Sequence, residues 1–151
     1  MAVNCKAGFS NMATQHQNMS STHVLPASIL VVEDEDLVRT TVVECLLDSG
    51  FNVLEAASGD EAINVLAAHD TPVNIVFTDV RMPGSVNGFD LARWVHAHEP
   101  FTGVIVTSGF VGAAMAPAGC GPLLAKPYHY PELLRRIRSL LTSGSAQLPI
   151  D

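Results

Sequence analysis

Residues 73–84 have the sequence VNIVFTDVRMPG. The stretch opens with a short run of apolar and β-branched residues, which predicts a buried strand over residues 73–77. One carboxylate, Asp79, follows this run almost directly. An acidic side chain at the end of a buried strand is costly unless it has a partner. We therefore interpret Asp79 as a candidate functional group.

Four more short apolar runs lie on either side of this stretch. They predict strands over residues 29–32, 52–55, 104–107 and 123–125. Segments with helical periodicity predict helices over 35–49, from a capping box at Ser58–Glu61, after Asn87-Gly88, over 111–116, and from Tyr130-Pro131 to Leu141. Repeated strand–helix units predict an α/β fold with a doubly wound parallel sheet and a site at the carboxyl ends of its strands.

The length and composition predict a single domain with two tails. The chain has 151 residues, of which 48% are hydrophobic, which is enough for one full core but not for two ordinary domains. Residues 1–26 are rich in Asn, Gln, Ser and Thr without any period, so we expect a flexible N-terminal extension. We expect the domain to cover residues 27–143 and a flexible C-terminal tail to cover 144–151.

The charge and the cysteines exclude several classes of protein. The formal net charge is −7, which argues against a nucleic-acid partner, because such surfaces neutralise phosphates with Lys and Arg. Cys5, Cys45 and Cys120 have no metal-binding spacing and are expected to be reduced thiols. The sequence has no apolar stretch of membrane-spanning length and no signal-peptide pattern. We therefore expect a soluble, cytoplasmic protein with no membrane partner.

Polar residues follow four of the predicted strands. They are Glu33-Asp34, Asp79, Thr107-Ser108 and Lys126-Pro127. The carboxyl ends of neighbouring parallel strands share one edge, so these groups are expected to meet in a small crevice. Carboxylates placed together repel one another unless a cation lies between them, and carboxylate oxygens with room for waters suit Mg²⁺. Glu35 and Asp36 are interpreted as solvated residues.

Four segments resemble the signature blocks of the response-regulator receiver family. They are residues 29–35, 75–84, 104–109 and 124–128, and the resemblance extends over about residues 28–142. It implies a flavodoxin-like (βα)5 fold with strand order 2-1-3-4-5, in which the fourth helix of this chain, predicted from its own residues over 111–116, is short. It also implies a two-component phosphorelay protein that accepts a phosphoryl group from phosphohistidine and signals by conformational change. Such a protein is a phosphoacceptor that assists its own phosphorylation and dephosphorylation, not an enzyme.

The resemblance also assigns the metal site. Asp79 matches the phosphoacceptor, and Asp34 matches the direct Mg²⁺ ligand. Glu33 matches the acidic neighbour that usually holds a metal-bound water, although aspartate is commoner at this position. The backbone carbonyl of Arg81 matches the third protein ligand.

Two further residues match groups that act on the phosphoryl oxygens. Ser108 matches the hydroxyl that moves onto the phosphoryl group, and Lys126 matches the lysine that pairs with it. Thr107 is an alternative for the hydroxyl; we prefer Ser108 because Gly109 then fits the small residue expected next. Pro127 matches a proline that commonly follows a cis bond. The implied partner is a histidine kinase or a histidine phosphotransfer protein, and we expect no output domain.

Two departures support an alternative function. Leu123 stands where the family usually has an aromatic switch residue, and the helix predicted over 111–116 is short. The chain could therefore be a receiver-like protein-binding module whose activity does not depend on phosphate. An aspartyl phosphatase of the haloacid dehalogenase type is disfavoured, because that class needs an aspartate two residues after the nucleophile, where this chain has Arg81.

Overall fold

The computed structural model describes residues 25–68, 72–109 and 123–145 of the chain. Its strands are β1 (Ser28–Val32), β2 (Asn52–Ala56), β3 (Ile75–Asp79), β4 (Gly103–Ser108) and β5 (Leu124–Ala125). Its helices are α1 (Asp36–Asp48), α2 (Gly59–Ala68), α3 (Gly88–His98) and α4 (Tyr130–Ser145). Strands and helices alternate from β1 to β4, as predicted. The helix predicted over 111–116 lies outside the described residues.

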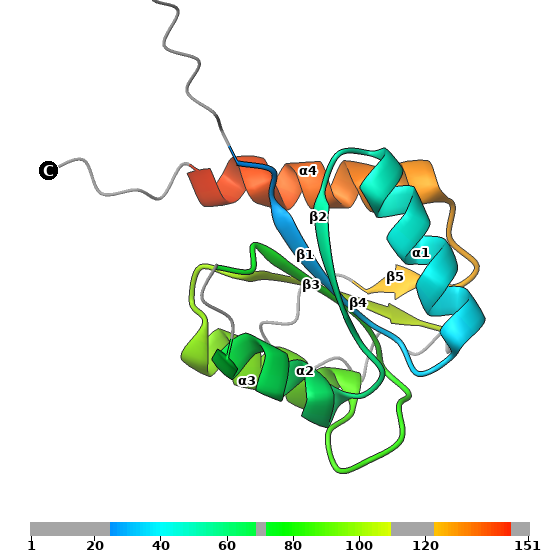
Figure 1. The fold of residues 1–151 in the computed structure, drawn as a ribbon, viewed down its shortest axis with the longest axis vertical. Helices are drawn as coiled ribbons and strands as arrows, with labels where there is room; N and C mark the ends of the chain where they lie inside the picture. Colours follow the sequence, from blue (N-terminus) through cyan, green and yellow to red (C-terminus); the bar gives the residue numbers. More distant parts are fainter. Residues whose placement is uncertain (1–24, 69–71, 110–122, 146–151) are drawn as a thin grey trace, which may run out of the picture.

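The strands form one parallel sheet in the order β2-β1-β3-β4-β5 (Figure 1). The predicted α/β fold and the predicted strand order are therefore confirmed. The chain leaves β1 for β2 on one side and then crosses to β3 on the other. Ligand sites of such sheets lie where the strand order reverses, at the carboxyl ends of the strands.

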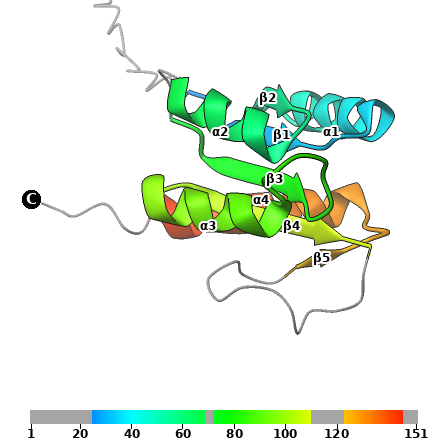
Figure 2. The same ribbon diagram turned by 90° about the horizontal axis from the view of Figure 1, so that it is seen from below.

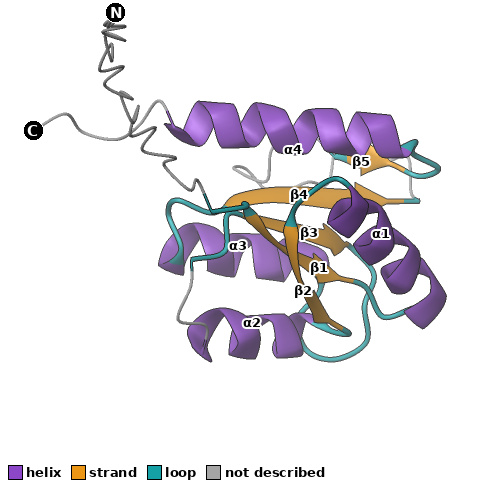
Figure 3. Cartoon of the chain, turned by 45° about the horizontal axis from the view of Figure 1, so that its top comes forward, coloured by secondary structure: helices purple, strands orange, loops and turns teal. Residues whose placement is uncertain are grey.

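Helices cover both faces of the sheet. Helices α1 and α4 lie on one face, and α2 and α3 lie on the other (Figures 1 and 3). Seen from below, α3 lies in front of β4 and of α4 (Figure 2). Successive residues of β1 point to opposite faces, so that Leu30 packs with the α2 and α3 side and Val31 with the α1 and α4 side. No helix in the described ranges is long and apolar enough to cross a membrane.

Most predicted boundaries are close to the observed ones. Strand β3 is an exception, because it begins at Ile75 and not at Val73. The carbonyl of Val73 accepts a hydrogen bond from the Thr102 hydroxyl at 2.7 Å, which takes the place of a bond to a neighbouring strand. At the start of α2, the Ser58 hydroxyl accepts from the Glu61 amide at 3.1 Å, as a capping box predicts.

Candidate functional site

Strands β3, β4 and β5 bring their polar residues to one edge of the sheet. The register of β3 and β4 aligns Asp79 with Thr107. The backbone amide of Lys126 donates to the carbonyl of Ser108 at 2.9 Å, which fixes the start of the segment after β5. The fold therefore brings Asp79, Ser108 and Lys126 together at the edge that the sequence predicted.

Lys126 lies between two carboxylates. Its Nζ donates to Asp79 Oδ2 at 2.7 Å and lies 3.7 Å from Glu33 Oε2. Burial opposes the charged form of Lys126, but the hydrogen bond and charge of Asp79, together with Glu33, outweigh it and raise the pKa of the lysine. Lys126 therefore stays cationic and compensates part of the negative charge around it. The peptide bond between Lys126 and Pro127 is cis.

Glu33 and Asp34 differ in exposure although they are neighbours. The Glu33 side chain is 8% exposed, whereas Asp34 is exposed to solvent. Burial raises the pKa of Glu33, and its contact with Asp34 and the charge of Asp79 act in the same direction. The Glu35 amide, which donates to Glu33 Oε1 at 3.1 Å, and Lys126 partly offset this effect. Negative groups are thus crowded at this edge.

Arg39 of α1 contacts the acidic residues 33–36 that follow β1, and the sequence did not predict this contact. One guanidinium nitrogen donates to the Glu33 carbonyl at 2.7 Å and another to Asp36 Oδ1 at 2.6 Å. Its Nε also lies 3.4 Å from Glu55 Oε1 on β2. Arg39 therefore links the end of β1 to the neighbouring strand β2. Asp36 accepts a hydrogen bond from Arg39 while its own side chain stays exposed.

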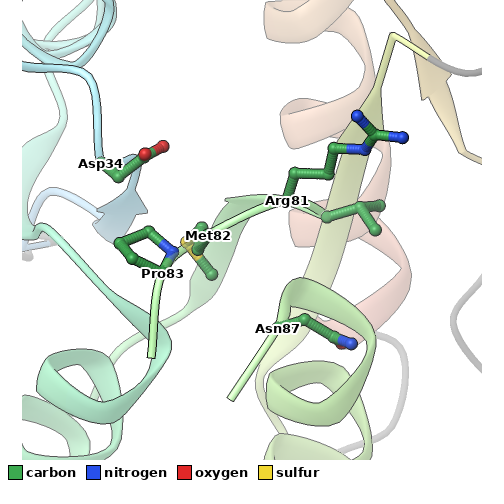
Figure 4. A pocket seen from close by; sticks show the side chains of 6 residues that line it. Asp34, Arg81, Met82, Pro83 and Asn87 are labelled. Carbon is green, nitrogen blue, oxygen red and sulfur yellow. The ribbon is translucent and has the colours of Figure 1, made fainter. Parts of the chain in front are cut away.

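An open pocket separates Asp34 from the segment that follows β3. It is lined by Asp34, Val80, Arg81, Met82, Pro83 and Asn87. Figure 4 shows Asp34 on one side of this pocket with Pro83 below it, and Arg81 and Asn87 on the other side, with the Arg81 side chain extending away from Asp34. The Arg81 amide donates to Asp79 Oδ1 at 3.3 Å, so the same segment also contacts Asp79.

The residues around this pocket fit a hard divalent cation. In the described part of the chain, no group of three or more His, Cys, Asp or Glu side chains is arranged to hold a metal ion by itself. Mg²⁺ does not need such a group, because it usually takes one or two carboxylates and keeps several waters. Asp34, Asp79 and a backbone carbonyl form a set of this kind, and the crowded negative charge favours a cation there.

The two hydroxyl residues at the end of β4 have different surroundings. Thr107 is 2% exposed, and its hydroxyl donates to the Leu124 carbonyl at 2.9 Å. Ser108 is partly exposed at the strand end. The Thr107 hydroxyl therefore has a structural partner on β5, which favours Ser108 for contact with a group bound at the edge of the sheet.

The start of α3 is packed tightly against Asp79. A Cβ on Gly88 would lie 2.1 Å from the Asp79 carbonyl oxygen, which leaves room for glycine alone. Asn87 caps the helix by accepting from the Asp90 amide at 2.9 Å, and Asp90 Oδ2 accepts from the Asn87 amide at 3.2 Å. The sequence placed the helix start correctly but did not predict this capping box or the contact with Asp79.

Comparison with known proteins agrees with this geometry. Residues 29–138 match the family model of the response regulator receiver domain. The chain belongs to this family. A receiver domain of two-component response regulators takes part in phosphoryl transfer and is not a classical enzyme.

Two relatives of this chain differ in how much of their own length it spans. A probable transcriptional regulatory protein of Picosynechococcus is 33% identical over 76% of this chain and 49% of its own length. The response regulator receiver protein CpdR of Brucella abortus is 29% identical over 77% of this chain and 98% of its own length. The chain thus spans about half of the first relative and nearly all of the second.

The solved structures agree with the fold. A crystal structure of a response regulator receiver domain protein from Clostridium thermocellum has a TM-score of 0.75 and 26% identity to this chain. The match covers 81% of this chain and 99% of that one. The receiver fold of this chain is therefore shared over almost the whole length of a solved relative.

Proposed function

We propose that this receiver domain is a phosphoacceptor that takes a phosphoryl group on Asp79. The observation that carries the proposal is the Asp79 carboxylate, which is largely buried at the end of β3 and bonded to Lys126 at 2.7 Å. A carboxylate oxygen of Asp79 attacks the phosphorus of a phosphohistidine, and the phosphorus–nitrogen bond breaks. The imidazole leaves with the electron pair, and an acyl phosphate forms on Asp79.

Charge neutralisation and positioning are the main contributions of the surrounding residues. Lys126 pairs with the incoming phosphoryl oxygens, and its contact with Glu33 keeps it oriented in both states. Asp34, Asp79 and the backbone carbonyl of Arg81 would hold Mg²⁺, with Glu33 on a bound water. The cation, when bound, neutralises charge on the phosphoryl oxygens.

Ser108 would transmit the event to the rest of the domain. A phosphoryl group on Asp79 adds strong acceptor oxygens at the edge of the sheet. The Ser108 hydroxyl, at the end of the adjacent strand, donates to one of them, and the backbone after β4 follows. The output is therefore a change of shape that a downstream protein detects.

The proposed phosphodonor is a histidine kinase or a histidine phosphotransfer protein. The negative charge disfavours a nucleic-acid partner, and we propose a cytoplasmic protein that acts through a protein contact, with no nucleic-acid or membrane partner. The domain is proposed to cover residues 27–143, slightly more than the 29–138 of the family match.

Phosphorylation with a small-molecule donor tests the proposal. The protein is incubated with acetyl phosphate and Mg²⁺, and the gain of one phosphoryl group is measured by intact mass spectrometry. Asp79→Asn should lose this gain and keep its fold, because the amide is nearly isosteric with the carboxyl group. Asp36→Asn is the matched control, since it changes an exposed carboxylate that touches Arg39 and not Asp79.

The same experiment distinguishes the phosphoacceptor from the alternative function, a protein-binding module that acts without phosphate. Leu123 packs against the core on the α2 and α3 side, where the resemblance implies an aromatic switch residue. If the unmodified chain gains no phosphoryl group, a protein-binding module that acts without phosphate becomes the better interpretation. If Asp79→Asn gains one on another residue, the assignment of Asp79 as the phosphoacceptor is wrong.

A further inference from the structure

Asp60, in the first turn of α2, holds the middle of the loop that connects β3 to α3. Its Oδ1 accepts a hydrogen bond from the Ser85 hydroxyl at 2.6 Å, and its Oδ2 accepts from the Ser85 amide at 3.2 Å. The Ser85 hydroxyl is the main cause of a lowered pKa of Asp60, and the amides of Ser85 and Val86 contribute in the same direction. Asp60 is therefore a carboxylate that accepts with both oxygens.

Two glycines allow this close approach between α2 and the loop. Gly84 has φ +98°, and a Cβ there would lie 2.5 Å from Asp60 Oδ2. A Cβ on Gly59 would lie 2.5 Å from the Val86 carbonyl oxygen. The loop thus lies directly against the start of α2 (Figure 1), in a position that side chains at 59 and 84 would not permit.

The same loop forms most of the pocket wall opposite Asp34. Val80, Arg81, Met82, Pro83 and Asn87 line that pocket, and all of them belong to the loop. At its beginning the Arg81 amide bonds to Asp79, and at its end the Gly88 amide donates to the Val80 carbonyl at 2.9 Å. The Asp60 contacts hold the part between these two ends.

We infer that Asp60 is a positioning residue for the Mg²⁺ site. It fixes the loop so that the backbone at Arg81 stays opposite Asp34 and beside Asp79. This inference rests on the proposed function, because it assumes that the pocket holds a metal ion. The carboxylate is required, since an asparagine has one acceptor oxygen and would turn its amide group toward a donor of Ser85.

Titration of Mg²⁺ into the unphosphorylated protein tests this inference. Amide chemical shifts are followed by ¹H–¹⁵N NMR at constant ionic strength, which also shows whether each variant is folded. Asp60→Asn should weaken Mg²⁺ binding by about tenfold, the size of effect typical of residues that orient metal ligands. Glu61→Gln is the matched control, because it removes a carboxylate from the same helical turn but contacts Ala57 and not the loop.

Ser85 provides the second variant pair. Ser85→Ala removes the hydroxyl donor and should weaken Mg²⁺ binding in the same direction as Asp60→Asn, whereas Ser85→Thr keeps the hydroxyl and should restore the affinity. Hydrogen exchange without metal should be faster in residues 80–87 of Asp60→Asn and Ser85→Ala than in Glu61→Gln. Faster exchange in these two variants would show that Asp60 orders the loop before any metal binds.

The outcomes distinguish this inference from the proposed function. If the unmodified protein binds Mg²⁺ and Asp60→Asn binds it with the affinity of Glu61→Gln, the inference is overturned and the phosphoacceptor proposal stands. If the unmodified protein binds no Mg²⁺, both the metal site and the role of Asp60 are overturned. Recovery of affinity by Ser85→Thr, but not by Ser85→Ala, supports the inference.

Discussion

Lys126 and the two carboxylates beside it, Asp79 and Glu33, are buried to different extents. The Lys126 side chain is 30% exposed, compared with 13% for Asp79 and 8% for Glu33. Partly buried ion pairs contribute little net stability, because desolvation offsets most of the attraction. The arrangement is better explained by chemistry: when Asp79 carries a phosphoryl group as an acyl phosphate, Lys126 still has Glu33 nearby and a new anion to pair with.

Asp34→Ala and Glu35→Ala separate the two adjacent acids. Asp34 lines the pocket, whereas Glu35 contributes its backbone amide to Glu33. Asp34→Ala should weaken Mg²⁺ binding by about tenfold or more and slow phosphorylation by acetyl phosphate. Glu35→Ala keeps the backbone amide and should change either quantity little. Equal losses in both variants would show that the metal ligand has been assigned to the wrong acid.

At the level of residues, the sequence predicted the polar side chains that directly follow strands, but not the side chains that hold neighbouring segments in place. Asp79 and Lys126 could be found because each comes at the end of an apolar run. Arg39 and Asp60 could not, because their partners lie on segments that only the tertiary fold brings near. Ser108 was preferred over Thr107 because of Gly109, and the contact of Thr107 with β5, which favours the same choice, is not encoded locally in the sequence.

At the level of elements, β5 is short and needs support from β4. It has two residues, and their pairing aligns Thr107 with Leu124 and Ser108 with Ala125. The Thr107 hydroxyl adds a side-chain bond to the Leu124 carbonyl. The position of Lys126 therefore depends on how firmly β5 is held.

Thr107→Val tests this support. The variant keeps the shape of the side chain but removes a buried donor, so it should lower the free energy of unfolding by about 1–3 kcal/mol. Thr41→Val is the control, because the Thr41 hydroxyl bonds to Leu37 on the exposed face of α1 and its loss should cost less than about 0.5 kcal/mol. Urea unfolding measures both changes. Equal unfolding free energies for the two variants would contradict a supporting role for Thr107.

Gly88→Ala tests the contact between α3 and the end of β3. The added methyl group would overlap the Asp79 carbonyl oxygen, so we expect a loss of about 1–3 kcal/mol or more, together with slower phosphorylation. Gly144→Ala in α4 is the control, because nothing lies within 4 Å of its added Cβ. It should be neutral or stabilise by up to about 1 kcal/mol. Urea unfolding of both variants decides the point, and equal stability would refute the packing argument.

Element boundaries were harder to predict than elements. The apolar run at 73–77 predicted a strand, but it could not show that the Val73 carbonyl bonds to Thr102 and that the strand therefore starts later. Conversely, Gly50 directly follows the segment predicted as the first helix, and its φ of +90° lies in the left-handed region that favours glycine at a helix end. A backbone conformation that favours glycine can be predicted from the local sequence. A hydrogen bond from a side chain that is distant in the sequence cannot.

At the scale of the molecule, the sheet separates two cores. Strand β1 is apolar at every position from Ile29 to Val32 because both of its faces are covered, which is typical of a central parallel strand. Strand β2, at the edge of the sheet, is exposed at Asn52 and Glu55. The composition of β1 and β2 therefore reflects a central and an edge position, whereas the full strand order was implied by the family resemblance.

The net charge of −7 leads to the last prediction, because a divalent cation should stabilise this molecule both generally and specifically. A ligand that binds only the folded state, at ten times its Kd, adds about 1.4 kcal/mol to the free energy of unfolding. Urea unfolding in MgCl₂ should show this gain over KCl of equal ionic strength, and chelation should remove it. Asp34→Ala should be stabilised equally by the two salts. If the unmodified protein also gains equally from both, the cation acts by screening and not at the Asp34–Asp79 site.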